Sequence, residues 1–131
     1  MTDTAELPFT SDFYDIEALL PDADRALLAD VREFMTSEVA PIINDYWSRE
    51  EFPHEIWPRL ADLGLGGLVL DGFVAMELAS VDSSVATGLG VHSHLAMGSI
   101  HKCGSEEQKE RWLPPMARLE KIGAFGLTEP D

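Results

Sequence analysis

The sequence predicts an all-α fold, an up-and-down arrangement of helices over residues 21–120. Apolar residues recur at steps of three and four along this range, which is the spacing of one face of a helix. Helix start and stop signals separate the periodic stretches, and no repeat or low-complexity tract interrupts them. A strand is predicted only at the end of the chain.

The composition is that of one domain with an acidic surface. A chain of 131 residues with 45% hydrophobic residues is large enough to bury a core. The net charge of −15 argues against nucleic acid or an anionic membrane as a partner, because both are bound by clustered Lys and Arg. The single cysteine, Cys103, forms no internal disulfide, and the acidic start resembles no targeting signal, so we expect a cytoplasmic protein.

The first two helices follow an arm of little periodicity at residues 1–20. Asp22 or Asp24 can cap the first helix, and Pro41 is expected to kink or split it because proline lacks a backbone donor. Pro53 starts a short second helix, and Gly64 stands at the position of a C′ glycine. The apolar stripes are Leu28, Val31, Met35, Val39, Ile42 and Tyr46 in the first helix and Ile56, Leu60 and Leu63 in the second.

The third helix has a buried stripe made of Leu70, Val74, Leu78 and Val81. Glu77 falls beside this stripe in the middle of the helix. A buried carboxylate there could be catalytic, but we favour an exposed or capped one.

A fourth helix is predicted from about Ser83 to Lys102, closed by Gly104. Gly88, Gly90 and Gly98 lie inside it, and each costs about 1 kcal/mol relative to alanine. Small residues recur along one side of this helix at Ala86, Gly90 and Ser93. Two explanations stay open. The small residues allow close helix–helix packing, or they clear a wall along which a ligand lies.

Ser105 and Gln108 form a capping box that starts the fifth helix, which Pro114 and Pro115 are expected to interrupt. Residues 121–128 read as a strand that enters a turn at 129–131. A strand needs neighbours to pair with, so we interpret residues 121–131 as the beginning of a β-domain that belongs to a longer protein.

No catalytic or metal-binding set stands out in the sequence. The histidines of the fourth helix, His92, His94 and His101, lack an acidic or cysteine partner three or four residues away, so no metal site is predicted. Cys103 lies near a helix C-terminus, where the helix dipole disfavours a thiolate. The chain also lacks a glycine-rich phosphate loop.

Short motifs run along the chain in a fixed order. They are FP at 52–53, LADLG at 60–64, MELA at 76–79, VD at 81–82, GSEEQK at 104–109, WLP at 112–114 and FGLTEPD at 125–131. Each motif is weak alone, but the ordered set resembles the acyl-CoA dehydrogenase family. The nearest resemblance is to the branch that holds glutaryl-CoA dehydrogenase and the short-chain acyl-CoA oxidases of plants. One departure is that residues 68–71 follow Gly67 directly, where the family has a longer glycine-containing loop.

The resemblance implies a helical N-terminal domain, a middle β-domain and a C-terminal helical bundle, usually in a homotetramer. Family members hold FAD and act on acyl-CoA, and they pass electrons to an electron-transfer partner. A glutamate in the C-terminal bundle removes the α-proton, while the β-hydrogen leaves as hydride to the flavin. We therefore expect this chain alone to be inactive and to bind FAD weakly.

The resemblance also assigns candidate site residues. Phe125, Leu127 and Thr128 match the strand end beside the flavin ring, although Phe125 and Leu127 would also suit a plain strand core. Ala86, Thr87 and Gly90 match positions that line the acyl pocket. Glutaryl-CoA dehydrogenases carry arginine and serine at the positions of Ala86 and Gly90, so a dicarboxylic substrate is disfavoured and a simple short or branched acyl chain is preferred.

Two functions follow as hypotheses. The first is the N-terminal part of an FAD-dependent acyl-CoA dehydrogenase, which desaturates acyl-CoA thioesters between the α and β carbons. The alternative is a short, non-catalytic helical interaction module derived from that domain. The reading frame after Asp131 discriminates between them, since only the enzyme requires two further domains there.

Overall fold

A computed structural model describes residue 12, residues 14–67 and residues 71–128 of the chain. Within these residues the fold is all-α, as predicted, and no strand is present. The helices, in chain order, are η1 (Ile16–Leu19), α1 (Asp22–Phe34), η2 (Met35–Val39), α2 (Ala40–Ser48), η3 (His54–Ile56), α3 (Trp57–Asp62), α4 (Asp71–Val81), α5 (Ser83–Gly90), η4 (Val91–Met97), α6 (Gly98–Cys103) and α7 (Glu106–Ala117).

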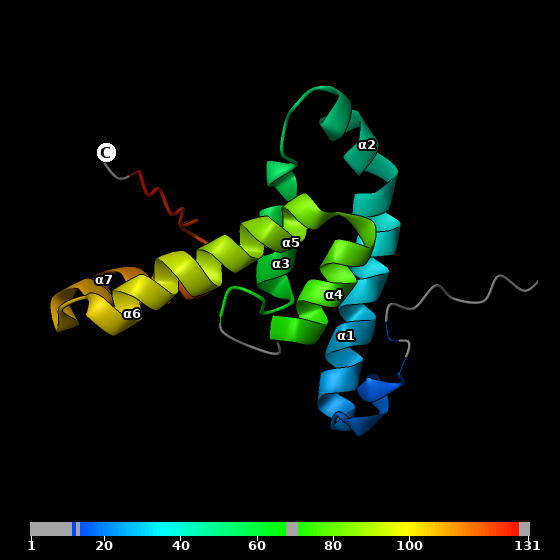
Figure 1. The fold of residues 1–131 in the computed structure, drawn as a ribbon, viewed down its shortest axis with the longest axis horizontal. Helices are drawn as coiled ribbons and strands as arrows, with labels where there is room; N and C mark the ends of the chain where they lie inside the picture. The colour runs from blue at the N-terminus through cyan, green and yellow to red at the C-terminus, as the bar shows by residue number, and fades with distance from the viewer. Residues whose placement is uncertain (1–11, 13, 68–70, 129–131) are drawn as a thin grey trace, which may run out of the picture.

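Two long helical columns set the shape of the molecule. The helices α1, η2 and α2 run on without a break and form one column, and α5, η4 and α6 form the other (Figure 1). The hairpin of α4 and α5 joins them, because α4 packs against both α1 and α5. The short α3 lies near α5, and α7 packs back against α6 at the far end of the second column.

The first column contains a π-helical turn, η2, which ends at Val39, and Ala40 and Pro41 then begin α2. Pro41 therefore changes the hydrogen-bond register of the helix and does not split it. The extra residue in a π turn rotates the following helix, and so Ile43 is buried where the sequence predicted Ile42. The capping prediction was wrong: α1 begins at Asp22 after Pro21, without a side-chain cap.

The short α3 ends at Asp62, and Gly64 stands at the predicted C′ position with a φ of +72°. Leu65 N–H donates to the Leu60 carbonyl at 3.0 Å, and Gly64 N–H donates to the Ala61 carbonyl at 2.9 Å. These two bonds are the Schellman pattern, which favours glycine because the left-handed conformation strains a side chain.

The capping box predicted for α7 is confirmed. Ser105 Oγ accepts from Gln108 N–H at 3.2 Å, and Gln108 Oε1 accepts from Ser105 N–H at 2.9 Å. The predicted interruption at Pro114 and Pro115 was wrong, since α7 continues through both to Ala117. Each proline removes one N–H donor, but both stand in the last four positions of the helix, so only its final turn loses hydrogen bonds.

Two groups of buried side chains hold these helices together. The main core lies between α1, η2, α3, α4 and α5, and includes Leu28, Val31, Met35, Leu60 and Leu78. A smaller cluster of Ala96, Met97 and Met116 lies between η4 and α7, with Ile100, Trp112 and Leu113 packed against it. The second column thus serves both clusters.

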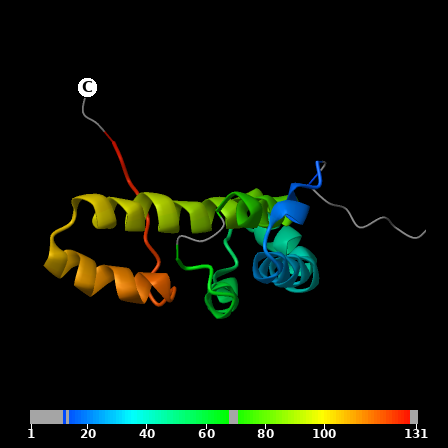
Figure 2. The ribbon, with the colours of Figure 1, turned by 90° about the horizontal axis from the view of Figure 1, so that it is seen from below.

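The chain leaves α7 and runs across the second column to its other side (Figure 2). Residues 121–128, predicted as a strand, show neither helix nor strand hydrogen bonding. A strand forms only against a neighbour, and the described residues offer no second extended segment for pairing. That this segment opens a β-domain therefore stays a prediction, and residues 129–131 lie outside the described part.

Candidate functional site

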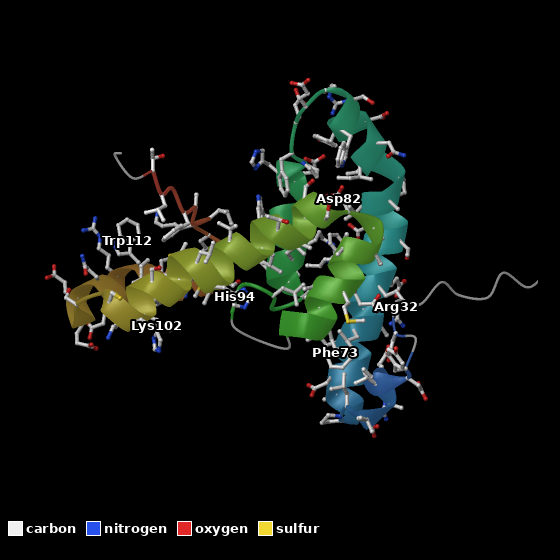
Figure 3. All side chains as sticks on the ribbon, viewed as in Figure 1. Arg32, Phe73, Asp82, His94, Lys102 and Trp112 are labelled. Carbon is white, nitrogen blue, oxygen red and sulfur yellow. The ribbon has the colours of Figure 1, made fainter. Side chains whose placement is uncertain are left out.

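The second column begins at Asp82, which fixes its start in two ways. One carboxylate oxygen accepts from Val85 N–H at 2.9 Å and caps α5. The other accepts from the indole N–H of Trp47 on α2 at 2.7 Å. Figure 3 shows Asp82 at the top of the column. The cap therefore sets both where the helix begins and how it sits against α2.

Ala86 and Gly90 border a cavity of about 30 Å³, and that this cavity is part of the acyl pocket stays a prediction. Its other lining residues come from α4, the second column and the turn after α3: Leu65, Gly67, Val74, Ala75, Leu78, Leu89, Ser93 and His94. Most of these side chains are apolar, as a pocket for an alkyl group requires. In the described part of the chain, Ser93 Oγ is the one buried side-chain polar atom without a hydrogen-bond partner.

The glycines of the second column are not demanded by close packing. A Cβ added to Gly90 would lie 3.9 Å from His94 Nδ1, one on Gly98 would lie 4.0 Å from the Ser93 carbonyl oxygen, and one on Gly88 would lie 3.5 Å from Trp57. All three distances are ordinary van der Waals contacts. For Gly90, the described neighbours therefore favour a cleared wall over tight helix–helix contact.

Thr87 lies apart from Ala86 and Gly90, because successive helical residues point about 100° apart. It borders an open groove of about 550 Å³. The groove is lined by Trp47, Phe52, His54 and Trp57, by Ser83, Ser84, Gly88 and Val91 of the second column, and by Ile122, Gly123 and Ala124. Phe52 and Trp57 stack there with ring centroids 5.5 Å apart. The three predicted pocket residues therefore face two different spaces.

The predicted flavin-side residues lie on the terminal segment after this groove. Phe125 borders a hollow of about 360 Å³ beside Ile100, Trp112 and Met116, yet 48% of its surface stays exposed. Leu127 is 71% exposed, and Thr128 is exposed as well. Exposed apolar side chains at alternate positions, such as Phe125 and Leu127, form a surface that another group can cover.

His92 was not predicted to act in the site, yet it is fully buried beneath the terminal segment. Gly123 N–H donates to its Nδ1 at 2.9 Å, and its Nε2 lies 3.0 Å from the Met116 carbonyl oxygen. Burial lowers the pKa of the imidazole, because water no longer solvates the charged form. No sequence signal announced this role, because the partners lie 24 and 31 residues away.

Glu77 is buried, as one of the two interpretations required, but it has a structural partner. Both of its carboxylate oxygens accept from Arg32, which also binds Glu17. The hydrogen bonds with Glu77 raise the pKa of the Arg32 guanidinium above its ordinary value. A carboxylate held by two donors is a poor general base, so Glu77 joins elements of the fold and is no candidate for catalysis.

The remaining candidates for chemistry stay apart. In residues 12, 14–67 and 71–128, no three His, Cys, Asp or Glu side chains gather where a metal ion could bind. Cys103 is exposed. Among the helices of this same region, none has both the length and the apolar content that a bilayer crossing needs.

Comparison with known proteins agrees with this arrangement. The family model "Acyl-CoA dehydrogenase, N-terminal domain" matches residues 21–120. The chain is 38% identical over 114 residues to the short-chain specific acyl-CoA dehydrogenase of Clostridium acetobutylicum, a match that covers 77% of this chain and 30% of that protein. The chain thus spans about a third of the length of the curated relatives it matches.

Two solved structures share the fold. A glutaryl-CoA dehydrogenase from Mycobacterium smegmatis in complex with FADH2 superposes with a TM-score of 0.79 at 34% identity, covering 89% of this chain and 33% of that one. Butyryl-CoA dehydrogenase from Megasphaera elsdenii gives a TM-score of 0.74 at 29% identity, covering 85% and 33%. The chain belongs to the acyl-CoA dehydrogenase family, and it carries the family's N-terminal helical domain.

Proposed function

We propose that this chain is the N-terminal part of an FAD-dependent acyl-CoA dehydrogenase that desaturates acyl-CoA thioesters between the α and β carbons. The observation that carries the proposal is that one helical column borders an apolar cavity at Ala86 and Gly90 and underlies the exposed segment ending at Thr128. Family membership and the placement of both features on one framework support these roles.

In this proposal the second column supplies one wall of the acyl pocket. Ala86 and Gly90 leave room beside an apolar lining, and an alkyl chain entering that space gains the free energy of burying apolar surface. Binding there positions the thioester end of the substrate for the base and the cofactor.

The terminal segment supplies a contact to the cofactor. FAD, when bound, provides the acceptor for the hydride that leaves the β carbon. Phe125 and Leu127 present exposed apolar surface that suits a flat aromatic ring, and the Thr128 hydroxyl can donate to a polar ring edge. The exposure of all three residues fits a role in which another group covers them.

The substrate class follows from what the cavity lacks. Ala86 and Gly90 offer no donor, and the described lining contains no Lys or Arg. Its polar side chains are Ser93 and His94, so a distal carboxylate placed there would lose water without gaining a guanidinium or ammonium partner. We therefore propose a simple short or branched acyl group and not a dicarboxylic one.

The other properties of the whole enzyme are proposed from the family alone. The catalytic base and most of the FAD site lie outside this chain, so the chain alone is inactive and binds FAD weakly. The whole protein is a cytoplasmic homotetramer that passes electrons to an electron-transfer partner. The alternative is an interaction module without catalysis. The apolar groove around Phe52 and Trp57, in which a partner could bind, is the observation that favours it.

The test uses the gene product that includes the reading frame after Asp131. Purified protein is assayed with butyryl-CoA and glutaryl-CoA and an artificial electron acceptor. Turnover of butyryl-CoA with little turnover of glutaryl-CoA is expected. Gly90→Arg should reduce butyryl-CoA turnover at least tenfold, because a charged side chain enters the cavity, while His101→Arg at an exposed position of α6 should not.

Two results would contradict the proposal. A stop codon after Asp131 would favour the interaction module. Equal butyryl-CoA turnover by Gly90→Arg and parent would remove Gly90 from the pocket. In addition, calorimetric titration of the isolated chain with FAD should show no binding at micromolar concentration, and tight binding would mean that the cofactor site is already complete.

A further inference from the structure

His92 connects three parts of the molecule at one point. It lies on the π-helical segment η4 and is fully buried. One ring nitrogen meets the carbonyl oxygen of Met116, near the end of α7, and the other meets the backbone N–H of Gly123 on the terminal segment. The ring therefore stands where the chain turns away from α7.

The partners of the ring define its tautomer. A backbone N–H can only donate, so Nδ1 must carry a lone pair to accept the bond from Gly123. The carbonyl of Met116 can only accept, so Nε2 must carry the proton. Both bonds are possible only for the neutral imidazole protonated on Nε2, and a second proton would remove the acceptor for Gly123.

The terminal segment also packs closely against the second column at Gly123. A Cβ added to Gly123 would lie 2.5 Å from Ala96 Cβ and 2.7 Å from Met116 Cε. Distances this short are not found for real side chains, so only glycine fits at this approach. Steric closeness and the hydrogen bond thus point independently to a fixed position for Gly123.

The number of residues between Gly123 and Phe125 determines how closely the position of Phe125 is restricted. An extended chain advances about 3.3–3.6 Å per residue, so Phe125 lies within about 7 Å of the anchored Gly123. Without the bond to His92, the preceding backbone hydrogen bond in the described chain is Glu120 N–H to the Pro115 carbonyl. The free tether to Phe125 would then grow from two residues to five.

We propose that His92 is a positioning residue that fixes where the chain leaves α7 and thereby sets the placement of residues 125–128. That this segment contacts the flavin rests on the proposed function. The placement of the segment itself does not, because every contact that fixes it lies within this chain.

If His92 only filled space, an apolar residue of similar volume could replace it without releasing Gly123. Leucine has a similar volume and can fill the position, but it can neither accept from Gly123 nor donate to Met116. Asparagine is smaller, but its side-chain oxygen stands one bond beyond Cγ, as Nδ1 does, and can accept from Gly123. The pair His92→Leu and His92→Asn therefore separates packing from hydrogen bonding.

The experiment is nuclear magnetic resonance on the full chain with ¹⁵N labelling and without flavin. We expect the His92 ring to show a protonated Nε2 and an unprotonated Nδ1, and Gly123 N–H to exchange slowly with solvent. In His92→Leu, exchange at Gly123 should be at least tenfold faster and the signals of residues 124–128 should shift. His92→Asn should restore much of the protection, and the amides of Leu28 and Val31 in the main core serve as the internal control.

Two results would overturn the proposal. One is equal exchange at Gly123 in the parent and in a folded His92→Leu variant. The other is a proton on Nδ1 in the parent, which decides the question even if His92→Leu does not fold. Because no flavin is present, either result leaves the proposed enzymatic function untouched, and failure of that function leaves the anchor untouched.

Discussion

Arg32 on α1 donates two hydrogen bonds to Glu77 on α4, from Nε to Oε2 at 2.9 Å and from Nη2 to Oε1 at 2.7 Å. The same Nη2 reaches Glu17 of η1 at 2.9 Å. The Glu77 side chain is only 8% exposed, while that of Arg32 is 34% exposed. One guanidinium therefore joins three elements and compensates the charge of a buried carboxylate.

Replacing Arg32 with methionine should destabilise the fold, because Glu77 would keep its burial and lose both donors. Breaking a buried pair costs about 3–5 kcal/mol, and the partial exposure of Arg32 reduces this to about 2 kcal/mol. Urea denaturation followed by circular dichroism measures the difference in unfolding free energy.

The double variant Arg32→Met/Glu77→Leu is the matched control, since it removes the carboxylate together with its partner. It should lie closer to the parent than Arg32→Met does. If Arg32→Met unfolds at the same urea concentration as the parent, the pair contributes no stability. The pairing would then no longer account for the burial of the Glu77 carboxylate.

Gly98→Ala should stabilise the chain by about 1 kcal/mol, because alanine has the higher helix propensity. Gly98 has helical backbone angles, φ −58° and ψ −40°, and its nearest neighbour would lie 4.0 Å from the new Cβ. Gly104→Ala is the control with opposite sign, because its Cβ would lie 2.5 Å from the Ile100 carbonyl oxygen. A loss of stability in Gly98→Ala would show that the column does need small residues for packing.

Short stretches of sequence predicted where several helices begin and end. The capping box at Ser105, the terminator at Gly64 and the span of the long column from Ser83 all follow from short stretches of sequence. The predicted interruption at Pro114 and Pro115 failed, since α7 continues through both prolines to Ala117, with Met116 buried against η4. At Pro41 the helix also continues, after a π turn.

The site was less predictable, because its contacts join distant parts of the chain. The resemblance grouped Ala86, Thr87 and Gly90 in one pocket. In the structure Ala86 and Gly90 border one cavity, and Thr87 borders the separate groove. The pairing of Glu77 with Arg32 spans 45 residues, and that of His92 with Gly123 spans 31. No periodicity encodes such contacts, so the roles of Glu77 and His92 became visible only in the fold.

The stability of the chain should depend on pH through His92. Its folded pKa lies below the ordinary 6.5, so above about pH 6.5 both folded and unfolded states are neutral there and the contribution is fully present. As pH falls below 6.5, the unfolded state takes up a proton that the folded state resists, and stability is lost toward the folded pKa. The loss is at most about 1.4 kcal/mol per pH unit.

The measurement compares the parent with His92→Asn by urea denaturation between pH 7.5 and 5. The net charge of −15 also changes over this range, but it changes in both proteins and cancels in the difference. His101→Asn, at an exposed position, should follow the parent curve. Parallel curves for the parent and His92→Asn would mean that the buried ring is not linked to folding.

The isolated chain should associate with itself more strongly as salt rises. Ile122, Phe125 and Leu127 expose 44, 48 and 71% of their surfaces. Ile122 also lines the apolar groove, and the other two follow it in the chain. Apolar surface of this kind favours association, which the net charge of −15 opposes at low ionic strength. At about 0.15 M salt the charges are screened within about 8 Å, so the apolar attraction prevails.

Sedimentation velocity at low and moderate salt tests this expectation on the parent chain and on the double variant Phe125→Ser/Leu127→Ser. Both substitutions fall at exposed positions beyond the anchor at Gly123, so they remove apolar surface without leaving His92 unpaired. The parent should sediment as larger species in moderate salt, and the double variant should remain nearer the monomer. Monomers for both proteins at both salt concentrations would show that the exposed segment needs no cover, and would favour the self-sufficient interaction module over the enzyme.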